Sequence, residues 1–243
     1  MNHKLIEVEQ GVFRLVDDDQ GADVVHRNGE PLYRFMDNLY IRQQHLHLLT
    51  PEEVTNLCRA RSSNPQLISG ANARVKDVFL NYLERTTPKV VFEIGAGKLP
   101  LINTAPPGMI YILSDADPEA GEDISSDNNF CVFSSSDFRL GYGDSYFDVV
   151  VAVFVFQFHV YTKQIAELYR CIASNGVLIA NVYRRPQDAR LDLINDFKAA
   201  GFFVSVLSDP EKLCKIHEYW IIGKSEEKNT AAINLIESII SDD

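Results

Sequence analysis

The stretch FEIGAGKLPL, residues 92–101, combines an acidic side chain with two closely spaced glycines. An apolar run over residues 90–94 is typical of a buried strand, and we expect a short helix after the stretch. Gly95 and Gly97 would let a ligand approach the main chain where N–H groups are exposed at a helix start. These residues therefore predict a loop that binds a nucleotide-like ligand.

Two common nucleotide loops do not match this stretch. The dinucleotide pattern G-x-G-x-x-G has its third glycine where this chain has Pro100, which has a bulky ring and no N–H. A Walker loop needs Ser or Thr after Gly-Lys, and here Leu99 follows Lys98. NAD, FAD and ATP are therefore disfavoured as ligands.

A cofactor with a cationic end and a ribose fits these residues better. The Glu93 carboxylate would repel a pyrophosphate, but it can accept hydrogen bonds from an ammonium group, directly or through water. Asp115 stands 18 residues after Gly97, where a ribose-binding carboxylate is expected, and Asp117 competes with it for this role. S-adenosylmethionine carries both an amino-acid end and a ribose, so these positions predict it as the ligand.

Several segments in order resemble the class I S-adenosylmethionine-dependent methyltransferases, over roughly residues 72–224. FEIGAGK resembles the first motif of that family, with Leu99 where a third glycine is often found. YILSDADPE resembles the second motif, and SDFRLGYGDSYFDVV resembles the stretch after the third strand. FDVVVAVFVFQF and AELYRCIASNGVLIAN resemble the fourth strand and the helix and fifth strand that follow. The resemblance implies a methyltransferase that uses S-adenosylmethionine.

The resemblance also assigns roles to single residues. Cofactor contacts are expected at Glu93, Gly95, Ala96, Gly97, Asp115, Ala116, Asp137, Phe138 and Phe154. Asp115 matches the ribose-binding acid, Asp137 matches an Asp that contacts adenine, and Phe138 could pack on the adenine ring. Phe154 is larger than the residue common in the family, so a core position is an open alternative for it.

The acceptor site of this family lies past the fourth strand, which here means residues 157–161. His159 is the candidate catalytic base, because its ordinary pKa lies near neutrality; a surface histidine is the alternative. The sequence signatures of adenine, cytosine and arginine methylation are absent, as is the acidic cluster of metal-dependent catechol-type enzymes. His45 and His47 would point different ways on a helix, so we predict no metal site.

The elements that must position these residues follow from the apolar pattern. Up to Pro88 the spacing is mainly helical, over residues 32–40, after the helix start at Thr50, and over residues 72–85. Beyond it, apolar runs without alternation indicate strands buried on both faces, with helical patterns between them. The expected strands are 90–94, 109–113, 131–133, 147–156, 176–182, 202–207 and 219–222. This predicts an α/β fold with a doubly wound, mostly parallel seven-stranded sheet.

We expect a mainly helical N-terminal cap over residues 1–88, an S-adenosylmethionine-binding α/β domain over 89–224, and a tail helix over 225–243. Side chains between Tyr33 and His47 would face the methyl group of the cofactor. The favoured function is methyl transfer to an oxygen or nitrogen acceptor on a small molecule. A protein methyltransferase and a non-catalytic scaffold that retains the fold are alternatives.

Composition limits the partners. The formal net charge of −11 disfavours a nucleic-acid partner, because the surface repels phosphates. No apolar run reaches the ~18 residues of a membrane span, and the N-terminus does not resemble a signal peptide. The four cysteines are far apart and lack metal-type spacing. We therefore expect a cytoplasmic protein without membrane or nucleic-acid partners; its oligomeric state stays open.

Overall fold

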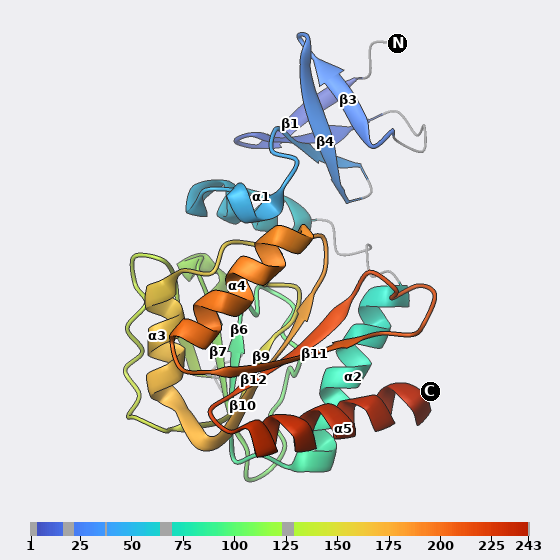
Figure 1. Ribbon diagram of the computed structural model, residues 1–243. Coiled ribbons are helices and arrows are strands. Elements are labelled where there is room, and N and C mark those ends of the chain that lie inside the picture. The colour runs from blue at the N-terminus through green and yellow to red at the C-terminus, as the bar shows by residue number, and fades with distance from the viewer. Residues whose placement is uncertain (1–3, 17–21, 37, 64–69, 123–128, 243) are drawn as a thin grey trace. The chain divides into compact units, whose positions relative to one another are not determined.

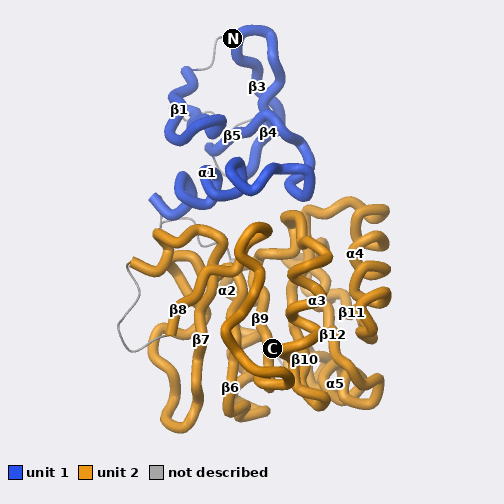
Figure 2. Tube along the Cα trace, turned by 90° about the vertical axis from the view of Figure 1, so that its left-hand side faces the viewer, with its two compact units in different colours: residues 1–68 blue, residues 69–243 orange. Residues whose placement is uncertain are grey.

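The computed structural model describes residues 4–16, 22–36, 38–63, 70–122 and 129–242 (Figure 1). The chain divides into two compact units, residues 1–68 and 69–243 (Figure 2). This division falls before the boundary expected at residue 88. The helix that ends at Thr86 belongs to the larger unit, because its buried side chains pack into that unit's core.

The smaller unit is built on a five-stranded antiparallel sheet with the order β1-β2-β5-β4-β3. Phe13, Val25, Leu32 and Tyr40 form its apolar cluster. The helix α1 (Pro51–Ser62) begins at the expected capping box, in which Thr50 and Glu53 bond to each other's main chain. The strands and the short 3-10 helix are β1 (Leu5–Glu9), β2 (Val12–Leu15), β3 (Val24–Arg27), β4 (Glu30–Met36), β5 (Leu39–Ile41) and η1 (Leu46–Leu48).

The prediction of a mainly helical N-terminal segment is wrong. Residues 32–40 have apolar side chains at helical spacing, yet they lie in β4 and β5. Asn28 and Gly29 have φ values of 54° and 86° and join β3 to β4 in a two-residue turn. Asn-Gly at such a turn strongly favours a hairpin, and the pairing of adjacent strands prevails over the apolar spacing.

The larger unit confirms the predicted seven-stranded, mostly parallel sheet. Its strand order is β11-β12-β10-β9-β6-β7-β8, and only β12 runs antiparallel to its neighbours. The strands are β6 (Val90–Ile94), β7 (Ile110–Asp115), β8 (Asn129–Val132), β9 (Phe147–Ala152), β10 (Ile172–Val182), β11 (Phe203–Ser208) and β12 (Glu218–Gly223). The run at 147–156 thus leaves the sheet after Ala152, earlier than expected.

Helices cover both faces of this sheet, as a doubly wound fold requires (Figure 1). Phe92 and Val91, neighbours in β6, belong to the clusters on opposite faces. One cluster receives side chains from α3 (Thr162–Cys171) and α4 (Gln187–Ala199), and the other from α2 (Gly70–Thr86) and α5 (Glu226–Asp242). The predicted tail helix is α5, and it contacts α2 and three strands.

The connections after β6 and after β8 contain no helix. Residues 95–109, all of which the structure describes, form turns and bends, so the short helix expected after the glycine loop is wrong. Pro100, Pro106 and Pro107 explain this, because proline lacks the N–H of a helical bond and restricts the residue before it. Between β7 and β8 the described residues include only the short 3-10 helix η2 (Pro118–Gly121).

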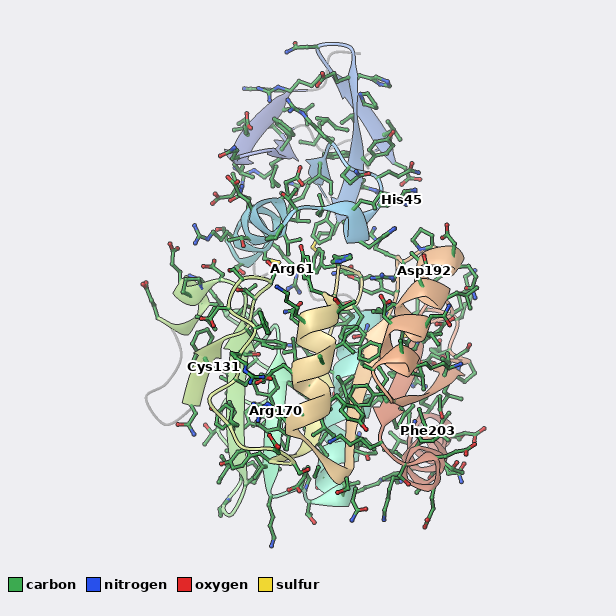
Figure 3. All side chains as sticks on the ribbon, turned by 60° about the vertical axis from the view of Figure 1, so that its left-hand side comes forward. His45, Arg61, Cys131, Arg170, Asp192 and Phe203 are labelled. Atoms are coloured by element: carbon green, nitrogen blue, oxygen red, sulfur yellow. The ribbon has the colours of Figure 1, made fainter. Side chains whose placement is uncertain are left out.

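Side chains of α3 hold the connection after β8, residues 133–146. The Glu167 carboxylate accepts the N–H of Leu140 at 2.9 Å, and the Arg170 guanidinium donates to the carbonyls of Leu140 and Tyr142 (Figure 3). Arg170 also pairs with Glu167 at 2.6 Å and with Asp144 at 2.7 Å. The buried Glu167 and the partly buried Arg170 therefore order this segment, which contains no helix.

No helix in the described part of the chain is long and apolar enough to cross a membrane.

Candidate cofactor site

The candidate site lies where the chain reverses its direction across the sheet. From β6 the chain moves outward to β7 and β8, and it then returns to β9 on the other side of β6. Open α/β sheets bind ligands at the carboxyl ends of the strands at such a reversal. Gly95 follows β6 and Val155 follows β9, and a Cβ placed on Gly95 would lie 2.6 Å from Cγ2 of Val155. The two strand ends therefore meet here.

The two glycines of the loop serve different purposes. Gly95 has φ +68° and has no room for a side chain beside Val155. Gly97 has φ +56°, and a Cβ placed there would have no described neighbour within 4 Å. Between them, Ala96 is buried and donates its N–H to the carbonyl of Ser114 at 2.9 Å. The main chain at Gly97 is thus open to a close approach, whereas Gly95 is required by internal packing.

Asp115 ends β7 beside this loop. Its Oδ2 accepts the N–H of Gly97 at 2.9 Å, and its Oδ1 accepts the N–H of Asp117 at 2.9 Å. Burial raises the pKa of Asp115, and main-chain bonds from Asp117, Gly97 and the exposed Ala116 oppose that shift. A carboxylate has about four acceptor sites, so capacity remains for a ligand hydroxyl. Asp117 instead caps η2, accepting the N–H of Glu119 at 3.1 Å, which favours Asp115 for the ribose.

Glu93 is buried beneath the loop, where its carboxylate accepts hydrogen bonds from other residues of this chain. Its two carboxylate oxygens accept the N–H of Leu101 at 3.0 and 3.1 Å, and Oε2 accepts the hydroxyl of Tyr111 at 2.7 Å. The residue is only 3% exposed, and this burial raises the pKa of Glu93 to about 7. Glu93 thus binds the far end of the loop, a geometry that the sequence alone does not reveal.

Asp137 and Phe138, expected near adenine, lie in a turn after β8. The N–H of Asp137 donates to Oγ of Ser134, and the N–H of Ser134 donates back to the Asp137 carbonyl. Asp137 is exposed, while Phe138 is half-buried with Nζ of Lys163 5.4 Å from the centre of its ring. The turn therefore has a carboxylate and an aromatic ring at consecutive positions after β8.

Phe154 adopts a left-handed backbone conformation, with φ +61°, which is uncommon for a bulky residue. Its N–H donates to Oδ1 of Asn181 at 2.6 Å, and its ring lies edge-on to Tyr183 and His217. Tyr183 and His217 stack with their ring centres 4.8 Å apart. Sequence reasoning missed Asn181, Tyr183 and His217. The one available signal was a polar Asn181 in the otherwise apolar strand β10.

The region expected to hold the acceptor follows Phe154. Gln157 is 4% exposed, and its Oε1 has no hydrogen-bond partner among the described residues. His159 is partly exposed with its ring edge-on to Tyr161, and partial burial followed by the nearby Arg185 lowers the pKa of His159. The imidazole is therefore neutral at pH 7 and can accept a proton. Arg185 is buried and donates to main-chain carbonyls.

No group of three or more His, Cys, Asp or Glu side chains among the described residues could hold a metal ion.

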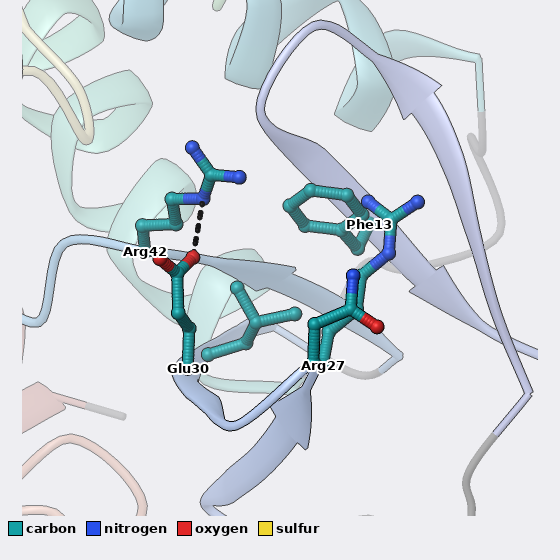
Figure 4. A pocket seen from close by; sticks show the side chains of 6 residues that line it. Phe13, Arg27, Glu30 and Arg42 are labelled. Carbon is teal, nitrogen blue, oxygen red and sulfur yellow. Dashed lines mark ion pairs between the residues drawn. The ribbon is translucent and has the colours of Figure 1, made fainter.

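A shallow hollow lies in the smaller unit (Figure 4). It is lined by Phe13, Arg27, Asn28, Glu30, Leu32 and Arg42. Both of its arginines have carboxylate partners, since Arg27 pairs with Glu7 and Arg42 with Glu30. The hollow therefore offers no uncompensated charge to a ligand.

No protein-family model matches the sequence, and no curated protein matches it. Solved structures of S-adenosylmethionine-dependent methyltransferases, the family that the sequence motifs resemble, are similar to the chain. A TehB-like member from Corynebacterium glutamicum is 13% identical, with 72% of this chain and 98% of that chain covered and a TM-score of 0.48. One from Aquifex aeolicus is 14% identical, with 72% and 97% covered and a TM-score of 0.47.

A third similar structure, from Thermotoga maritima, is described as a possible histamine N-methyltransferase. It is 16% identical, with 62% of this chain and 90% of that chain covered and a TM-score of 0.43. At identities this low, the chemistry of the present chain has to be argued from its own residues.

Proposed function

We propose that this chain is an S-adenosylmethionine-dependent methyltransferase that acts on an oxygen or nitrogen atom of a small molecule. The observation that carries the proposal is the bond between the N–H of Gly97 and the Asp115 carboxylate. It brings an open stretch of main chain and a partly buried acceptor together at the carboxyl ends of adjacent strands, beside the chain reversal. In open α/β folds a carboxylate at this position commonly binds a ribose hydroxyl.

The loop suits a cofactor without phosphates. Phosphate sites use free N–H groups at the start of a helix, where the helix dipole favours negative charge. Here the N–H groups of Ala96 and Gly97 are bonded within the chain, and residues 95–109, which are fully described, form no helix. The buried Glu93 and the partly buried Asp115 present carboxyl groups in place of donors, which disfavours an anion further. S-adenosylmethionine has a ribose and a positive charge but no phosphate, so it fits these residues where NAD and ATP do not.

The residues after β9 support an acceptor that carries a proton. When bound, S-adenosylmethionine supplies an activated methyl group on a sulfonium. The unsatisfied Oε1 of Gln157 can accept a hydrogen bond from an O–H or N–H group and so orient the acceptor. The neutral imidazole of His159 can take the proton that this group loses. Phe154 and Tyr183 add apolar surface that excludes water.

The proposed assignments for Asp137 and Phe138 follow the resemblance in the sequence, and the turn after β8 is compatible with them. We further propose a cytoplasmic location, without nucleic-acid or membrane partners. None of the four cysteines, all of which lie in the described part of the chain, forms a disulfide, as is usual in a reducing compartment.

Two measurements test the proposed function. Calorimetry should show that the protein binds S-adenosylmethionine and S-adenosylhomocysteine but neither NAD nor ATP. Incubation with methyl-labelled S-adenosylmethionine and a pool of small metabolites should then transfer label to a small product. Binding without transfer would favour a scaffold. Label on added proteins alone would favour a protein methyltransferase.

A further inference from the structure

We propose that Glu93 and Tyr111 act as a pair of positioning residues that shapes residues 95–102 for the cofactor. Neither side chain need touch the ligand: the pair acts through the main chain of the loop. The inference rests on the proposed function for the ligand, but the geometry of the pair is a property of the chain alone.

The far end of the loop is bound to these two side chains. Both carboxylate oxygens of Glu93 accept the N–H of Leu101. Tyr111 in turn donates to Glu93 at 2.7 Å. The main chain at Leu101 is therefore bonded to a carboxylate that Tyr111 holds in place.

The near end of the loop is bound to the same two strands. Ala96 donates to the carbonyl of Ser114, and Gly97 donates to Asp115. Ser114 also donates its hydroxyl to the carbonyl of Glu93 at 2.9 Å. β6 and β7 therefore hold both ends of the loop. The spacing between those ends, and hence the conformation at Gly97, depends on Glu93 and Tyr111.

Strand register explains why these two residues meet. Glu93 pairs with Leu113 across the parallel β6–β7 ladder. Tyr111 lies two residues before Leu113, so its side chain is on the same face of the sheet. That face is covered by α2, and Lys76 of this helix donates to the carbonyl of Leu99 at 3.4 Å. The helix therefore supports the middle of the same loop.

The charge of Glu93 gives the pair a functional signature. Burial raises the pKa of this carboxyl to about 7, and the groups that face it are Tyr111, Lys76 and Asp115. Lys76 opposes the rise and Asp115 adds to it. The raised pKa means that the folded loop favours the neutral acid, so ionising Glu93 in its buried position costs free energy. The loop should therefore be held less firmly above pH 7 than below it.

The test compares two buried tyrosines that each donate to a carboxylate. Tyr111→Phe removes the hydroxyl beside Glu93, and Tyr219→Phe removes a hydroxyl that donates to Asp209 at 3.0 Å. Without ligand, Tyr111→Phe should reduce the hydrogen-exchange protection of the Leu101 amide about three- to tenfold, the effect of losing one buried hydrogen bond. The affinity for S-adenosylmethionine should fall by a similar factor. Tyr219→Phe should change neither quantity by more than about twofold.

The pH profile provides the readout that a merely structural role would not change. Glu93→Gln cannot ionise, so the ratio of wild-type to Glu93→Gln affinity for S-adenosylmethionine should fall as the pH increases through about 7. A constant ratio between pH 6 and 8, or equal effects of Tyr111→Phe and Tyr219→Phe, would overturn the pairing. If the wild type bound no S-adenosylmethionine, the proposed function would fall. The exchange of Leu101 without ligand would still decide whether Glu93 and Tyr111 hold the loop.

Discussion

The main-chain N–H of Gly97 donates a 2.9 Å hydrogen bond to Oδ2 of Asp115, which joins the loop after β6 to the end of β7. One carboxylate thus orders the loop and keeps acceptor capacity for a ligand. The arrangement makes Asp115 the residue whose loss should affect the cofactor most directly.

Asp115→Ala should weaken S-adenosylmethionine binding by about 1.5–3 kcal/mol, because acceptors for the ribose and the loop are lost together. Asp117→Ala is the matched control, since it removes the neighbouring carboxylate that caps η2. Calorimetry on both variants checks the assignment. Equal losses for the two variants would contradict the choice of Asp115 over Asp117.

Gly95→Ala and Gly97→Ala should lower the stability of the fold for different reasons. Gly97→Ala places a methyl group in open space, so it should cost about 1 kcal/mol of stability from the positive φ alone. Gly95→Ala should cost more, because its methyl group overlaps Val155. Denaturant unfolding of both variants measures this difference.

Val155→Ala tests the reason for the larger loss. Combined with Gly95→Ala, it should restore part of the lost free energy of unfolding, with a coupling energy of about 0.5–3 kcal/mol. Combined with Gly97→Ala, it should restore none. Strictly additive effects for Gly95 and Val155 would contradict a contact between the two strand ends.

Glu167 should make stability fall in acid. Bonds from Arg170, with smaller help from Leu140 and Arg139, lower the pKa of Glu167 from 4.5 to about 2. A lowered pKa in the folded state gives stability that is complete above about pH 4.5 and lost as the pH falls toward 2. Glu167→Gln should therefore be less stable than the wild type at pH 7, and the difference should shrink in acid. Urea midpoints at several pH values measure it.

His159→Gln should lower the turnover number while leaving S-adenosylmethionine affinity unchanged, if His159 takes the acceptor's proton. Because the pKa of His159 is lowered, wild-type turnover should remain on its plateau to a pH below the ordinary histidine value of about 6.5. Tyr161→Phe keeps the ring that packs on His159 and serves as the control. A Gln variant with wild-type turnover would leave His159 a surface histidine.

The expectation that residues 1–88 cap the acceptor pocket stays a prediction. Hydrogen exchange with and without S-adenosylmethionine tests it, since ligand should slow exchange over residues 32–49 as well as in the glycine loop. Slowing in the loop and at Asp115 alone would favour an open site and a larger acceptor.

The central strands could be predicted because their signal is local and strong. Val90–Ile94 is apolar at nearly every residue and forms β6 with the predicted bounds. The strands β4 and β5 of the smaller unit could not be predicted from apolar spacing. Leu32 and Leu39 fit a helical period as well as a strand, and the Asn28-Gly29 turn outweighs that period.

The candidate site could be predicted where its residues lie at the ends of neighbouring strands. Gly97 follows β6 and Asp115 ends the adjacent strand β7, so their proximity follows from strand order. The neighbours of Phe154 come from two further strand ends, and no sequence spacing links Asn181 to His217. The Glu93 carboxylate bonds to Leu101 and Tyr111. These contacts form only in the folded loop, so the sequence alone could not predict them.

The absence of a helix from residues 95–109, all of them described, also has an entropic consequence. Ordering a residue costs roughly 1–2 kcal/mol of conformational entropy, and here a small set of side-chain bonds offsets it in place of a helical ladder. We expect such a segment to open locally before the sheet unfolds. Opening would present the exposed Lys98–Leu99 bond to a protease such as trypsin. A nick at that bond would therefore report on the cofactor loop while the sheet stays intact, and a bound cofactor should slow it.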